Sequence, residues 1–130
     1  MGEWVFGWIL DGRIMQDVLS GHPKEASPSP ENRRCGTSLR FYDPKAGQWN
    51  VCWFGTHNAF VVLVKGGAVG DRIVLQGVDS DGSQMRWSFN NIQAGSFLWR
   101  GETSNDRGQT WRVEQEMFLQ RRTVGTKTTS

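Results

Sequence analysis

The sequence alternates between short strand-like runs and turn signals along almost its whole length. Nine runs are rich in aromatic and β-branched residues, and Gly, Asp-Gly or Pro separates most of them. These runs are Trp4–Leu10, Arg13–Leu19, Thr37–Tyr42, Trp49–Phe54, Ala59–Lys65, Arg72–Val78, Gln84–Asn90, Phe97–Glu102 and Thr110–Gln120. Because short loops join them, consecutive strands should pair antiparallel. The sequence therefore predicts an all-β fold.

A meander of this length leaves two exposed edges unless it curls up, and closure into a barrel removes them. We predict an antiparallel up-and-down meander, closed or nearly closed into a β-barrel of about eight to nine strands, a size that can hold one small ligand. Residues 1–122 form the single domain. Within it, residues 22–34 are rich in Pro, Ser and charge and predict a flexible loop. The polar residues 123–130 predict a disordered tail.

Two turn signals predict which residues face each other. Asp11-Gly12, as a two-residue hairpin turn, sets Phe6 opposite Asp17, and Asp81-Gly82 in the same way sets Gln76 opposite Trp87. Continued across the later strands, this register collects one aromatic face, which we predict to be the ligand-binding interior. Its binding candidates are Trp4, Phe6, Trp8, Met15, Gln76, Trp87, Phe89, Phe97, Trp99 and Gln115.

The opposite face carries most of the charge, with Arg100 facing Glu114 and Glu102 facing Arg112 in this register. The segment from residue 59 to 78 differs, because it is apolar on both faces. The register sets Val61, Leu63 and Val74 inside and turns the following residues outward: Phe60, Val62, Val64, Ile73 and Leu75. An outward apolar face is typical of a partner surface, so we predict a homodimer through it.

The charge balance argues against some partners. Lys and Arg number 15 and Asp and Glu 13, so the net charge of +2 is too small to indicate a nucleic-acid partner. No apolar stretch is long enough to span a bilayer, and the N-terminal residues lack a basic region followed by an apolar one. We predict a cytoplasmic protein with no nucleic-acid or membrane partner.

The usual metal and nucleophile patterns are also missing. Cys35 and Cys52 should lie ~12 Å or more apart if Cys52 pairs with Leu39, too far for a disulfide. His22 and His57 are isolated and lack the spacing of metal ligands. There is no phosphate-binding loop and no dinucleotide fingerprint. We expect two free thiols, no metal and no cofactor.

Asp17 is the candidate for acid–base chemistry, because the register sets it among aromatic residues. A carboxylate in such surroundings holds a proton more readily unless a cation pairs with it. The alternatives are a buried salt bridge to Arg13 or Arg40, or exposure at the barrel rim. Gln76 and Gln115 could orient a ligand from the inner wall, or could simply pair with each other.

Residues 104–111 read Ser-Asn-Asp-Arg-Gly-Gln-Thr-Trp, the pattern S-x-D-x-G-x-T-W. This resembles the Asp-box, a hairpin motif of sialidases and several unrelated β-proteins. In that motif Ser and Asp side chains bond the turn backbone, Gly takes a positive φ and Trp packs beneath. One copy implies a structural hairpin and not a sialidase.

Several segments together resemble an uncharacterised bacterial family of lipocalin-like, calycin-type small β-barrels. They are Trp8–Val18, Gly36–Pro44, Arg86–Phe89 and Phe97–Glu102 through Arg112, and the resemblance covers roughly residues 3 to 121. It implies the barrel fold and no particular chemistry. Members have a further strand before the first Gly-x-Trp run, where this sequence begins, which implies an edge that needs a partner.

Two functions follow from this interior. The first is a ligand-binding barrel that holds an apolar, aromatic or isoprenoid-like molecule. The second is a cofactor-independent isomerase, cyclase or hydrolase that uses the same cavity, with Asp17 as its acid or base. The fold hosts both, so the sequence leaves open whether the chain is an enzyme.

Overall fold

The computed structural model describes residues 2–21, 34–56, 59–79 and 81–122. Nine strands form from these residues: β1 (Gly2–Ile9), β2 (Ile14–Gly21), β3 (Arg34–Asp43), β4 (Gln48–Gly55), β5 (Phe60–Val69), β6 (Arg72–Val78), β7 (Gln84–Asn90), β8 (Ser96–Ser104) and β9 (Arg112–Gln120). Each predicted strand is present, which confirms the all-β fold. In these ranges there is no helix of the length and apolarity needed to cross a membrane.

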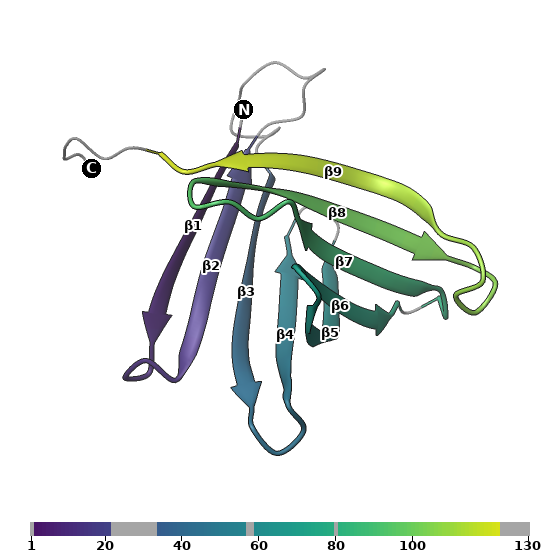
Figure 1. The fold of residues 1–130 in the computed structure, drawn as a ribbon, viewed down its shortest axis with the longest axis horizontal. Helices are drawn as coiled ribbons and strands as arrows, with labels where there is room; N and C mark the ends of the chain where they lie inside the picture. The colour runs from purple at the N-terminus through teal and green to yellow at the C-terminus, as the bar shows by residue number, and fades with distance from the viewer. Residues whose placement is uncertain (1, 22–33, 57–58, 80, 123–130) are drawn as a thin grey trace.

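The strands form one antiparallel meander in the order of the sequence, with β1 and β9 at its edges. Figure 1 shows the sheet curled into a half-barrel, in which the end of β9 crosses the N-terminal end of β1. The predicted loop 22–34 is shorter in the structure because Arg34 already begins β3. The rest of that loop and the predicted tail 123–130 lie outside the described residues.

The first hairpin follows the predicted register. Phe6 pairs with Asp17, and on either side Trp4 pairs with Leu19 and Trp8 with Met15. The strands end at Ile9 and Ile14, so the loop has four residues. A four-residue loop and a two-residue turn both have an even number of residues, so both give the same pairing and set the same side chains on each face.

The predicted register between β6 and β7 is wrong by one residue. Leu75 pairs with Trp87, and Gln76 pairs with Arg86. The cause is the loop, which spans residues 79–83 and is closed by a hydrogen bond from the Asp79 amide to the Ser83 carbonyl oxygen (2.8 Å). A one-residue change moves every side chain of a strand to the other face.

Because of this change, apolar side chains of β5 and β6 that were predicted to point outward point into the core instead. Val62, Val64 and Leu75 are buried, whereas Val61 and Leu63 are 62% and 50% exposed. Thus the residues predicted for a dimer surface, Phe60, Val62, Val64, Ile73 and Leu75, are core residues or pack against the core. That surface prediction is wrong, and Gln76 is exposed on the outer side instead of lining the interior.

Strands β7 and β8 keep their predicted faces with different partners, and β9 keeps its predicted face from Gln115 onward. Phe89 pairs with Trp99, and Trp99 pairs with Met117, two residues away from prediction in each case. The cross-strand ion pairs change accordingly. The cross-strand pairs formed are Arg86–Glu102 at 3.0 Å and Arg100–Glu116 at 2.6 Å, whereas Arg112 pairs with Glu114 of its own strand at 2.7 Å.

Candidate functional site

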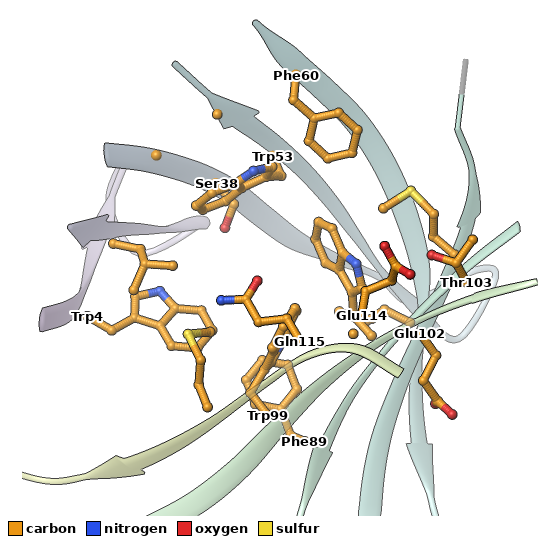
Figure 2. A pocket seen from close by; sticks show the side chains of 18 of the residues that line it. Trp4, Ser38, Trp53, Phe60, Phe89, Trp99, Glu102, Thr103, Glu114 and Gln115 are labelled. Atoms are coloured by element: carbon orange, nitrogen blue, oxygen red, sulfur yellow. The ribbon is translucent and has the colours of Figure 1, made fainter. Parts of the chain in front are cut away.

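The concave side of the half-barrel contains a cavity of about 460 Å³. This volume falls in the range of small-molecule sites. Most of its wall is aromatic or aliphatic, and Figure 2 shows side chains from both halves of the sheet converging on it. The apolar lining residues are Trp4, Leu19, Trp53, Phe60, Leu75, Met85, Trp87, Phe89, Trp99 and Met117.

Three tryptophans form a continuous aromatic wall. The ring centroids of Trp53 and Trp87 are 6.5 Å apart at 88°, and those of Trp87 and Trp99 are 5.8 Å apart at 58°. These are favourable edge-to-face and tilted arrangements. Gly36 makes room for the wall, because a Cβ there would lie 2.2 Å from the Trp53 ring.

Trp4 connects the first strand to the far half of the sheet. Its ring lies 6.0 Å from the rings of both Phe89 and Phe97. An ion pair between Glu3 and Arg122 joins the same two regions of the chain. Side chains therefore bring β1 against β7 and β8, although β1 and β9 remain the edges of the sheet.

Asp17 forms a dense polar network with Ser38 and Arg40, two residues that line the cavity. Its carboxylate has no exposed surface and pairs with the Arg40 guanidinium. The Ser38 hydroxyl donates to the same carboxylate, and the Ser38 amide donates to its other oxygen at 3.2 Å. Arg40 Nη2 also donates to Ser38 Oγ at 3.0 Å. The salt bridge to Arg40, one of the alternatives for Asp17, is the one that forms.

This network bears on the predicted role of Asp17. Ser38 and Arg40 line the cavity, but Asp17 does not. A ligand in the cavity would meet the guanidinium and not the carboxylate. In this position the Asp17 carboxylate holds Arg40, and its acid–base role stays a prediction.

A β-bulge at Gly101/Glu102 shapes the opposite wall. Gly101 pairs with Gln115 and Glu102 with Val113, so Glu114 is the additional residue on β9. Bulges re-aim side chains at barrel rims. Here both Glu114 and Gln115 line the cavity, and in Figure 2 the Gln115 amide lies near the centre of the view, between Trp4 and Trp99.

Half of the predicted binding residues reach the cavity. Five line it: Trp4, Trp87, Phe89, Trp99 and Gln115. Phe6, Trp8, Met15 and Phe97 share that face of the sheet without lining the cavity, and Trp8 is 58% exposed. Gln76 and Gln115 are on opposite faces, so their predicted alternative as a pair is wrong.

The cavity residues of β3 and β4 were not predicted from the sequence. Asp17 pairs with Ser38, and Ser38 pairs with Trp53, which continues the inner face across both strands. The signal was present in the turn after Asp43, since a four-residue loop to Gln48 sets this register. Asp43 Oδ1 accepts the Lys45 amide at 2.9 Å, as Asp does in such turns.

The Asp-box-like hairpin has the expected internal bonding. Ser104 Oγ accepts the Gly108 amide at 2.8 Å, and the Trp111 indole donates to the Gly108 carbonyl at 3.1 Å. The Thr110 hydroxyl and amide, and then Ser104, lower the pKa of Asp106 to about 2. Gly108 has a φ of 86°. These contacts all serve the turn.

Of the two cysteines, Cys35 lines the cavity and Cys52 does not. Cys35 and Cys52 are free thiols, and Cys52 pairs with Leu39 as predicted. Within the described ranges, no three His, Cys, Asp or Glu side chains gather as metal ligands would. His22 and His57 lie outside those ranges.

Comparisons with known proteins give no relative. No family model, no curated protein and no solved structure matches this chain.

Proposed function

We propose that this chain is a small-molecule binding protein that holds an apolar or aromatic ligand in the half-barrel. The observation that carries the proposal is the cavity of about 460 Å³ with its tryptophan wall. Aromatic walls supply apolar area and defined geometry, and a few polar groups orient the ligand. A lipocalin-like protein would work in this way.

The burial of Asp17 favours binding over catalysis. The alternative, a cofactor-independent enzyme, relied on Asp17 to exchange a proton with substrate. Its carboxylate is engaged by Ser38 and Arg40 and is separated from the cavity. We therefore propose binding without catalysis.

A dye titration with two neighbouring variants tests the proposal. Gln115 lines the cavity and Glu116 does not, although both are on β9. Gln115→Trp should fill the cavity and reduce the affinity for a neutral phenylnaphthylamine dye at least about tenfold. The reason is that the new side chain takes the place of the dye in one aromatic contact. Glu116→Trp adds the same side chain outside and should leave the affinity unchanged. Equal effects of both variants, or no dye binding by the unmodified protein, would overturn the proposal.

We also propose a homodimer, through a surface different from the one first predicted. A row of cross-strand neighbours on the outer face is mostly apolar and exposed: Val5, Val18, Thr37, Phe54 and Val61. Contiguous exposed apolar residues are typical of partner surfaces. Sedimentation velocity at micromolar concentration should give a dimer, and Val61→Lys should give a folded monomer. A monomeric unmodified protein would contradict this proposal.

A further inference from the structure

We propose that the ligand is an uncharged apolar molecule with a carbonyl-type acceptor that binds at Arg40. This inference rests on the proposed function and specifies its ligand. It starts from nitrogen atoms that have nothing to bond. Arg40 Nε and Trp4 Nε1 are buried N–H donors without an acceptor among the described residues. Buried donors are normally paired, because leaving one unpaired is costly.

The two side chains belong to the same part of the cavity wall. Trp4 and Arg40 both line the cavity, and both contact Phe6: its ring centroid is 5.1 Å from that of Trp4 and 5.6 Å from Arg40 Cζ. Of the Arg40 nitrogens, Nη2 is the one with acceptors in the described ranges, namely Asp17 and Ser38. This end of the cavity therefore has more N–H donors than acceptors. A small movement of the two side chains would bring Arg40 Nε and Trp4 Nε1 within hydrogen-bond distance of a ligand oxygen.

The charges around the cavity favour a neutral acceptor over an anion. Asp17 is in direct contact with Arg40 and cancels its charge. Of the carboxylic acids that line the cavity, Glu102 pairs with Arg86 and Glu114 with Arg112 in the same way. A carboxylate ligand would therefore find the Arg40 charge already compensated, and burying an anion without a free cation is costly. A ketone, aldehyde, ester or amide oxygen can accept from the same donors without that penalty.

A matched set of naphthalene probes separates these possibilities on the unmodified protein. Acetylnaphthalene, ethylnaphthalene, naphthoate and naphthylmethylamine, substituted at the same ring position, share their size but differ in the head group. Competition against the phenylnaphthylamine dye should rank acetylnaphthalene about tenfold tighter than ethylnaphthalene, as one added hydrogen bond would give. Naphthoate and naphthylmethylamine should bind more weakly than acetylnaphthalene.

A double variant assigns the preference to Arg40. Arg40→Gln alone would leave the Asp17 carboxylate buried without its cation, so it is combined with Asp17→Asn. If this variant remains folded, it should bind ethylnaphthalene as before and prefer acetylnaphthalene by no more than about twofold. The probe ranking of the unmodified protein stands as the test if the variant does not fold.

The outcomes distinguish the two proposals. Equal binding of acetylnaphthalene and ethylnaphthalene would overturn the carbonyl proposal and leave the binding protein intact. Tightest binding of naphthoate or of naphthylmethylamine would overturn it in favour of an anionic or a cationic ligand. Absence of binding by any probe and by the dye would overturn the proposed function itself.

Discussion

Asp17 on β2 and Arg40 on β3 form an ion pair at the cavity wall, with the Asp17 side chain fully buried and the Arg40 side chain 14% exposed. Removal of one partner of such a pair leaves a buried charge without compensation, whereas removal of both does not. This asymmetry separates a structural pair from an acid–base residue that acts alone.

We predict that Arg40→Met lowers the free energy of unfolding by about 3–5 kcal/mol. Asp17→Leu combined with Arg40→Met should be less destabilising than the sum of the two single changes. Urea denaturation of the four proteins completes the double-mutant cycle. If the effects add within about 0.5 kcal/mol, the two side chains do not interact as described.

The corrected register of β5 and β6 gives a second prediction. Leu75 on β6 is 2% exposed. Leu63, on the outer face of the neighbouring strand β5, is 50% exposed. Leu75→Ala should cost about 2–5 kcal/mol because it opens a cavity in the core. Leu63→Ala should cost less than about 1 kcal/mol, since a half-exposed side chain loses little burial. Thermal or urea unfolding measures both, and the reverse order would restore the register predicted from the sequence.

Side-chain alternation explains what the sequence could and could not predict. The face of β1 and β2 was predictable because the loop between Ile9 and Ile14 is even in length. The face of β6 was not, because Asp81-Gly82 gives no indication that the loop spans the five residues 79–83. The strands themselves were easier, since β-branched and aromatic runs between turn residues mark them directly.

The cavity was predictable in its aromatic residues and not in its polar ones. Trp87 and Trp99 follow from alternation along β7 and β8, where shifts of two residues leave the face unchanged. Glu114 reaches the cavity through a bulge that has no sequence signature. Arg40 reaches it because Asp17 and Ser38 hold its guanidinium, which is a contact between different strands.

Gly36 gives a prediction about the shape of the cavity. A Cβ at Gly36 would lie 2.2 Å from the Trp53 ring, whereas one at Gly7 would contact nothing within 4 Å. Gly36→Ala should displace Trp53, change the near-ultraviolet circular dichroism and weaken dye binding. Gly7→Ala makes the same substitution in β1 and should alter neither signal. Unchanged dye affinity in Gly36→Ala would show that the Trp53 wall is not part of the binding site.

The Asp106 turn gives a prediction of pH dependence. Hydrogen bonds from Thr110 and Ser104 lower the pKa of Asp106 from 3.8 to about 2, so the folded state favours the ionised form. Its stabilising contribution is therefore fully present above the unfolded pKa of 3.8 and is lost as the pH falls toward 2. Asp106→Asn should lower the melting temperature at neutral pH, and the difference from the unmodified protein should shrink below about pH 4. A difference that stays constant down to pH 2 would mean that these hydrogen bonds do not favour the ionised form.

The most direct test of the binding site uses the tryptophans themselves. The chain has seven Trp residues, each with an indole N–H that gives a separate resonance in a nitrogen–proton correlation spectrum. Four line the cavity and three do not: Trp4, Trp53, Trp87 and Trp99 against Trp8, Trp49 and Trp111. With the resonances assigned by single Trp→Phe changes, addition of the phenylnaphthylamine dye should shift the first four and leave the last three in place. Shifts confined to Trp8, Trp49 and Trp111, or no shift at a dye concentration that saturates fluorescence, would contradict a ligand site inside the half-barrel.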